Sequence, residues 1–167
     1  LFQLTKDIGN AFSPKFSPDG KQILFLNRAA EGPSSIWLMG PLGEDPHLLY
    51  AGANTIVAAD WSPDGKSIAF AMAVDQPNAY EIFLLDASQP SQPPRRLTQG
   101  IEGITGSLDW SPDGLSLLIC AGPTGDKNVF RLDLASVTIT QLTFGGNNAA
   151  ASYSPDGQYI VFNSLRN

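Results

Sequence analysis

The chain has 167 residues, of which 43% are hydrophobic, so it is long enough to bury a core without disulfides or metals. Its net charge is −6 and its ten basic residues are scattered, which excludes the basic patch that nucleic acid needs and leaves nucleic acid out of the expected partners. The single cysteine, Cys120, excludes an intrachain disulfide, and every apolar run is far shorter than the roughly 20 residues of a membrane helix, so we expect no membrane insertion.

The first element expected along the chain is a strand at residues 1–5, LFQLT. Its Leu4-Thr5 pair recurs in step with a repeat, as Leu49-Tyr50, Leu97-Thr98 and Leu142-Thr143, each 12 to 14 residues before a repeated serine. The last of these pairs ends a segment, residues 137–143, in which polar and apolar residues alternate as in an edge strand. We therefore interpret residues 1–5 as the last strand of a preceding unit.

The repeated serines belong to four nearly identical pentapeptides, FSPDG, WSPDG, WSPDG and YSPDG. Ser17, Ser62, Ser111 and Ser154 are 45, 49 and 43 residues apart, a spacing typical of a supersecondary unit. Proline presets φ, aspartate can accept hydrogen bonds from nearby amides, and glycine tolerates positive φ, so each copy predicts a tight turn between two strands. The expected units are residues 10–50, 54–98, 103–143 and an incomplete 147–167.

Within each unit the pattern predicts four short strands. The first is rich in small residues that suit a crowded axis, and the second is apolar at every position, as in a strand covered on both faces. Sixteen glycines and thirteen prolines interrupt the chain too often for helices. Second strands are expected at 23–26, 68–73, 117–121 and 160–162, third strands at 36–39, 82–85 and 129–134, and fourth strands at 47–50, 95–98 and 137–143.

Four-stranded sheets that repeat at this period predict an all-β fold, a β-propeller segment of antiparallel blades with about three full blades plus partial ones. The aromatic residue before each turn is expected to fill the space between neighbouring blades, where its ring buries the most area. These residues are Phe16, Trp61, Trp110 and Tyr153.

The sequences WSPDGKSIAF at 61–70 and SIWLMG at 35–40 resemble the TolB-like, PD-type relatives of WD-repeat propellers. The resemblance covers essentially the whole chain and implies the propeller fold, but such repeats occur in proteins of several functions, including the propellers of prolyl-oligopeptidase relatives. The third unit departs from the pattern with Leu115 where lysine is usual, and the fourth has no third or fourth strand.

Catalytic motifs are absent from the sequence. It has no Gly-x-Ser-x-Gly, no glycine-rich phosphate loop, and a single histidine, His47, without a partner for metal binding. We expect no catalytic residue, metal or cofactor. The expected function is a non-enzymatic, TolB-like binding or scaffolding module for a protein or peptide; the alternative is the gating propeller of a prolyl-oligopeptidase-type serine peptidase whose hydrolase domain lies outside this chain.

Acidic residues recur in two settings. The turn aspartates Asp19, Asp64, Asp113 and Asp156 are expected to stabilise the turns rather than bind calcium, because the ligand-rich spacing of a calcium loop is missing. Asp60 and Asp109 precede tryptophans in two units, where they are expected to form hydrogen bonds between blades rather than ligand contacts.

Binding residues are expected in the loops that vary most, those joining second to third and fourth to first strands, because loop variation on a rigid scaffold carries function. Both kinds of loop are expected at one rim. The candidates are Arg28, Asp75, Asn78, Glu102, Asp126, Lys127 and Asn147.

The two ends each leave a blade unfinished, which predicts a longer propeller of roughly six to eight blades whose remaining blades lie elsewhere in the polypeptide. The alternative is a ring completed by a second copy of the chain. Composition leaves periplasmic, secreted and cytoplasmic locations open.

Overall fold

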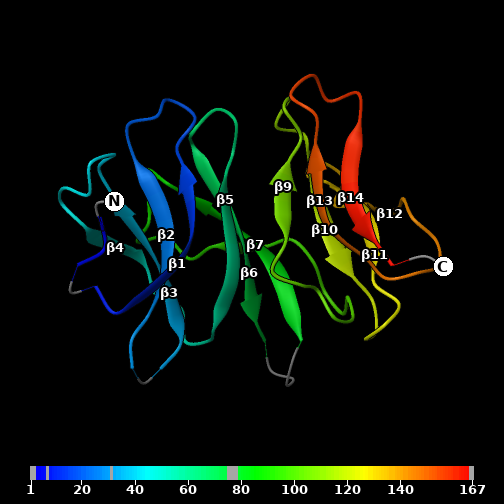
Figure 1. Cartoon of the computed structure of the whole chain (residues 1–167), viewed down its shortest axis with the longest axis horizontal. Helices are drawn as coiled ribbons and strands as arrows, with labels where there is room; N and C mark the ends of the chain where they lie inside the picture. Colours follow the sequence, from blue (N-terminus) through cyan, green and yellow to red (C-terminus); the bar gives the residue numbers. More distant parts are fainter. Residues whose placement is uncertain (1–2, 7, 31, 75–78, 166–167) are drawn as a thin grey trace.

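The computed structural model describes residues 3–6, 8–30, 32–74 and 79–165, which form fourteen β-strands and no helix. Three four-stranded sheets and one two-stranded sheet follow one another along the chain, and Figure 1 shows them standing side by side. We call them blades 1 to 4. This arrangement confirms the all-β propeller segment of antiparallel blades.

Every sheet is an antiparallel meander, in which each strand pairs with the strand next to it in sequence. Blade 1 contains β1 (Asn10–Phe16), β2 (Ile23–Arg28), β3 (Ser34–Met39) and β4 (His47–Tyr50). Blade 2 contains β5 (Ile56–Trp61), β6 (Ser67–Ala73), β7 (Tyr80–Asp86) and β8 (Arg95–Arg96). Blade 3 contains β9 (Leu108–Trp110), β10 (Ser116–Ala121), β11 (Asn128–Asp133) and β12 (Ile139–Gln141), and blade 4 contains β13 (Asn148–Tyr153) and β14 (Ile160–Ser164).

The second strand of each blade contacts the blades on both sides, because successive side chains of a strand point to opposite faces. In β6, Ile68 and Phe70 pack in a cluster with blade 1, whereas Ala69 and Ala71 pack in a cluster with blade 3. The residues of β10 alternate in the same way between blades 2 and 4. A strand that serves two cores must be apolar at every position, which is the pattern in the sequence.

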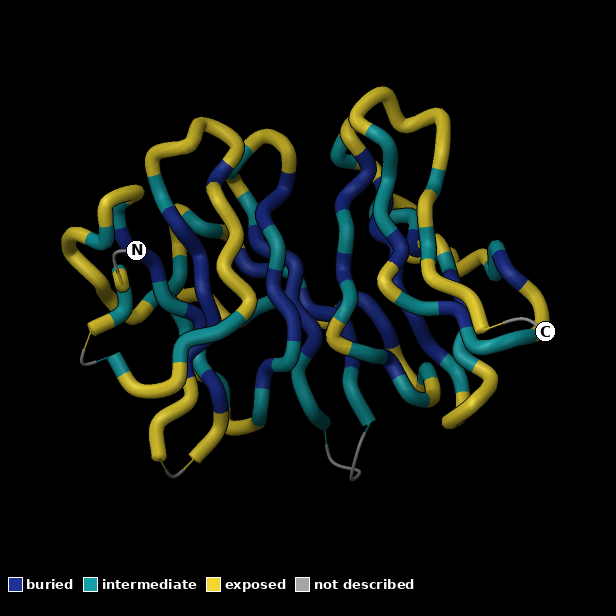
Figure 2. The backbone as a smooth tube through the Cα atoms, in the orientation of Figure 1, coloured by how far each residue is buried: buried dark blue, intermediate teal, exposed yellow. Residues whose placement is uncertain are grey.

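Burial therefore depends on the presence of a neighbour. All six residues of β10 are buried. Val161 of β14, by contrast, has its side chain on the face of the sheet that points away from blade 3, and it is 69% exposed. Figure 2 shows deep burial along the middle strands of the segment and exposure along β14.

The aromatic residues before the turns fill the spaces between blades as predicted. Trp61 belongs to the cluster between blades 1 and 2, Trp110 to that between blades 2 and 3, and Tyr153 packs against the cluster between blades 3 and 4. Phe16 has no sheet on its outer side in the described structure and is 63% exposed.

Each SPDG turn is held by its own side chains. In the third turn, the Ser111 hydroxyl donates to the Asp113 carboxylate at 2.6 Å and accepts from the Ser116 amide at 2.9 Å, and the same carboxylate accepts from the Leu115 amide. The glycine, Gly114, has φ of 73°, which favours glycine. The other three turns repeat these bonds.

The turns also pack against one another along the segment. A Cβ built on Gly65 would lie 3.7 Å from Cδ of Pro18, and one on Gly114 would lie 3.8 Å from Cδ of Pro63. The glycine of each turn thus abuts the proline of the turn before it. Proline and glycine recur because the turn both closes its own hairpin and fits its neighbour.

The assignment of residues 1–5 to the last strand of a preceding blade stays a prediction. Residues 3–6 form no strand here, and residues 1 and 2 lie outside the described part. A fourth strand needs a third strand beside it, and the described residues offer none at this position. Leu4 nevertheless packs on Ile23, Phe25 and Met39, just as Leu97 packs on the second strand of blade 3.

We predict that Ser111→Ala destabilises the fold by about 1–3 kcal/mol, because it leaves the buried Ser116 amide without an acceptor. Ser154→Ala is the matched control. Ser154 makes the same bonds in a turn where the paired Tyr159 is 70% exposed, so water can replace the lost partner and the cost should stay under about 1 kcal/mol. Urea unfolding of both variants gives the comparison, and equal costs would contradict the role of burial.

Candidate functional site

The segment has two rims of different construction. The four SPDG turns lie along one, the turn rim, and the loops joining second to third and fourth to first strands lie along the other, the loop rim. In Figure 1 the turn between β13 and β14 is at the top and the β10–β11 loop is at the bottom. Hydrogen bonds join the two kinds of loop, from the Gly122 amide to the Glu102 carbonyl and from the Asn148 amide to the Lys127 carbonyl.

The serine and aspartate side chains of the turn rim are occupied by the turns themselves. Hydrogen bonds from serine hydroxyls, followed by bonds from backbone amides, lower the pKa of the turn carboxyl groups of Asp19, Asp64, Asp113 and Asp156. These carboxylates are therefore bound within their own hairpins.

The loop rim gathers four of the residues expected to bind. Glu102, Asp126, Lys127 and Asn147 lie on three adjoining loops of blades 2 to 4, where the Lys127 amide donates to Asn147 Oδ1 at 3.3 Å. Arg28 lies apart on blade 1, with its guanidinium carbon 5.7 Å from the centre of the Phe12 ring. Asp75 and Asn78 lie outside the described residues.

A pocket of about 410 Å³ opens between blades 2 and 3 at this rim. The β10–β11 loop forms one wall, the loop from β8 to β9 another, and the start of β7 a third. Its lining includes Tyr80, Glu102, Ile104, Pro123, Thr124 and Lys127.

Lys127 joins two walls of this pocket. Its ammonium donates to the Gly103 carbonyl at 2.7 Å and also to the Gly122 carbonyl. A Cβ at Gly103 would collide with the Gly122 carbonyl oxygen, so glycine at 103, with φ of 64°, allows the two loops to approach this closely. Lys127, one of the binding candidates, is half-buried.

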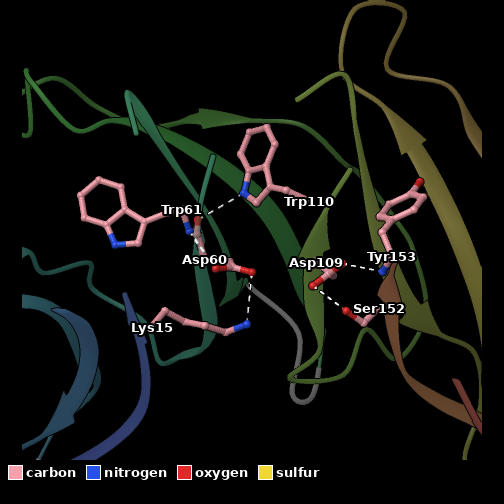
Figure 3. Close-up of polar contacts among 7 residues, drawn as sticks. All are labelled: Lys15, Asp60, Trp61, Asp109, Trp110, Ser152 and Tyr153. Carbon is pink, nitrogen blue, oxygen red and sulfur yellow. Dashed lines mark hydrogen bonds and ion pairs between the residues drawn. The ribbon is translucent and has the colours of Figure 1, made fainter. Parts of the chain in front are cut away.

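A row of polar residues connects the first strands of the four blades (Figure 3). The Lys15 ammonium lies 3.3 Å from the Asp60 carboxylate. Asp109 accepts from the Ser152 hydroxyl at 3.1 Å and from the Tyr153 amide at 2.8 Å. Asp60 and Asp109 thus bond to neighbouring blades, as predicted.

Burial raises the pKa of the Asp60 carboxyl group above its ordinary value of 3.8. The Lys15 ammonium opposes this effect and the negative charge of Asp109 adds to it. Keeping the Asp60 carboxylate ionised therefore lowers the free energy of unfolding. Asp60 forms contacts between blades and is not part of the loop rim.

Sequence reasoning missed a second set of structural residues, the threonines of the Leu-Thr pairs. The Thr98 hydroxyl accepts from the Ile82 amide at 2.9 Å and donates to Glu81, which is only 2% exposed and also pairs with Arg96 at 3.2 Å. In blade 3, Thr143 likewise joins the Val129 amide to Asn128. The recurrence of Leu-Thr was a signal for this role, but the partners are far away in sequence.

Among the described residues, no group of three or more His, Cys, Asp or Glu side chains is placed to hold a metal ion. The same part of the chain contains no helix with the length and apolarity needed to span a membrane.

We predict that Asp60→Asn stabilises the fold at pH 7. A raised pKa means that the folded state holds the ionised carboxylate less well than the unfolded state does, so the unfolding free energy falls as the pH rises from 3.8 through the raised pKa. Asparagine does not ionise, and its oxygen can still accept from the Trp61 amide.

Urea unfolding at pH 3 and pH 7 measures this effect. The gain of Asp60→Asn over the native chain should be larger at pH 7 than at pH 3, where Asp60 is mostly protonated in both states. Lys15→Met is the matched control and should lower stability at pH 7 more than at pH 3. A loss of stability in Asp60→Asn that appears only at pH 7 would show that the ion pair outweighs burial.

A family model described as "TolB beta propeller domain" matches residues 35–167. The chain is 34% identical over 158 residues to the protein Atu1656 of Agrobacterium fabrum, covering 92% of this chain and 50% of that protein. It is 35% identical over 112 residues to the "Tol-Pal system protein TolB" of Wolinella succinogenes, covering 65% of this chain and 25% of TolB. It thus spans half or less of these relatives.

A "Tricorn protease homolog" of Saccharolobus solfataricus is 28% identical over 160 residues, 93% of this chain and 14% of that protein. Among solved structures, the putative TolB from Agrobacterium tumefaciens superposes with a TM-score of 0.79 at 31% identity, covering 93% of this chain and 54% of that one. The family model matches most of the chain and the superposition on the putative TolB agrees with it, so the chain belongs to the TolB beta-propeller domain family.

Proposed function

We propose that this chain is a non-catalytic binding or scaffolding segment of a TolB-like propeller, and that a protein or peptide partner docks on its loop rim. The observation that carries the proposal is the contrast between the rims. Turn-rim carboxylates are used inside their hairpins, whereas the loop rim presents exposed Glu102 and Thr124 in the lining of a pocket. Exposed Asp126 lies on the same loop as Thr124, and its carboxylate accepts from Asn128 Nδ2 at 3.3 Å. Exposed polar side chains in the loops of a rigid scaffold are available to a partner.

The relatives support a protein as the partner. Several of them are named as Tol-Pal system proteins, which describes a system of proteins rather than a reaction. The net charge of −6 argues against nucleic acid as the partner. The pocket is too small for a folded domain, so a domain would meet the rim surface and place only one or two side chains in the pocket.

A second candidate is the gating propeller of a peptidase, supported by the relatives named as Tricorn protease homologues. The solved prolyl oligopeptidase and puromycin hydrolase structures share the fold at 21% identity or less, so they carry no argument about activity. The two candidates differ in the natural full-length protein. Covalent labelling of that protein by a fluorophosphonate probe would favour the peptidase and contradict a non-catalytic propeller.

We predict that Glu102→Lys and Asp126→Lys each reduce recovery of the bound partner at least about threefold in affinity capture from a lysate of the source cells. Charge reversal at an interface weakens complementarity and slows association. Gln158→Lys is the matched control, since Gln158 is exposed on the turn rim and uses only its backbone amide there. Unchanged recovery in both loop-rim variants, or a loss confined to Gln158→Lys, would place the binding face elsewhere.

A further inference from the structure

We propose that the pocket between blades 2 and 3 binds a single carboxylate of a peptide, with the Lys127 ammonium as its counter-ion. This inference rests on the proposed function, because it names the chemistry of the partner that the loop rim would take. It is drawn from the hydrogen bonds of Lys127, from the charge balance of the pocket and from its apolar walls.

The Lys127 ammonium is fixed, but no carboxylate of the described residues pairs with it. It has three N–H donors, and the carbonyls of Gly103 and Gly122 accept from two of them. Lys15, Lys21 and Arg96 each lie within 4.0 Å of a carboxylate, whereas within the described part of the chain Lys127 does not. A half-buried cation whose partners are neutral carbonyls keeps a donor and a net charge for an incoming anion.

The rest of the pocket restricts which anion fits. Glu102 also lines it, and its negative charge disfavours a phosphate dianion more than a carboxylate with one charge. Tyr80 and Pro123 supply apolar surface beside the lysine. These walls suit an apolar side chain next to the carboxylate in sequence.

The volume agrees with this occupant. At about 410 Å³ the pocket lies in the lower part of the range of roughly 300–1,000 Å³ found for small-ligand sites. It has room for an acidic residue and one neighbouring side chain of a peptide. The occupant we infer is therefore a peptide segment in which an apolar residue is adjacent to an aspartate or glutamate.

Titration of the ¹⁵N-labelled protein with two blocked peptides, acetyl-Ala-Phe-Glu-amide and acetyl-Ala-Phe-Gln-amide, tests the inference by NMR. The Glu peptide should shift the amide signals of Gly103, Gly122 and Lys127 in a saturable way. The Gln peptide should bind roughly tenfold more weakly, since it lacks the charge-assisted bond. Equal affinity for both peptides, or shifts confined to other blades, would overturn the proposal.

Variants separate the charge of Lys127 from its role in joining the loops. Lys127→Met should bind the Glu and Gln peptides equally well. Lys127→Arg should keep at least half of the preference, measured as the logarithm of the ratio of the two dissociation constants. Glu102→Gln leaves the carbonyl bond of Glu102 intact and should bind the Glu peptide several-fold more tightly. Lys66→Met, on the turn rim, is the control and should change nothing. The assignment would be contradicted if Glu102→Gln bound the Glu peptide no more tightly than the unchanged protein, or if Lys127→Met still preferred the Glu peptide to the Gln peptide.

A phosphoserine peptide of the same length provides the competing outcome. Tighter binding of this dianion than of the Glu peptide would overturn the assignment of a single carboxylate. If none of the three peptides binds, but Glu102→Lys and Asp126→Lys still lose partner capture, the pocket assignment is wrong and the proposed function is supported. If partner capture is unchanged in both variants, the proposed function is wrong.

Discussion

The second strand of each blade is covered on both faces, and this constraint organises the rest of the segment. Because alternate side chains of β6 enter two different cores, one blade cannot bury its second strand alone. The aromatic residue before each turn and the row from Lys15 to Ser152 act on the same interfaces. Where a neighbour is missing from the described structure, as beside Phe16 and Val161, residues of these types become exposed.

The same constraint separates structural from functional surface. Adjacent blades must keep their turns in contact, so the turn rim uses proline, glycine, serine and aspartate in the same way each time. The loops at the other rim differ from blade to blade in length and charge. A partner that recognises this protein among propellers of the family has more to distinguish at the loop rim, which is where the pocket with Lys127 lies.

The sequence predicted what depends on short spacing. The SPDG turns, the apolar second strands and the aromatic residues at 61, 110 and 153 all follow from local turn chemistry and strand alternation. Contacts between distant residues could not be read in this way. The Lys127 bonds to Gly103 and the burial of Glu81 beneath Thr98 depend on which loops meet after folding. The strand expected at residues 1–5 stays a prediction: residues 3–6 form none here, because pairing requires a neighbouring strand that the described residues do not supply.

Amide hydrogen exchange of the 167-residue chain tests most directly whether neighbouring blades stabilise each second strand. The comparison is between β10, covered by blades 2 and 4, and those amides of β14 that donate to β13, which are covered by blade 3 alone. The account predicts that the β10 amides exchange only on global unfolding, whereas the β14 amides exchange through local opening at least about tenfold faster. Equal protection of the two strands would contradict it.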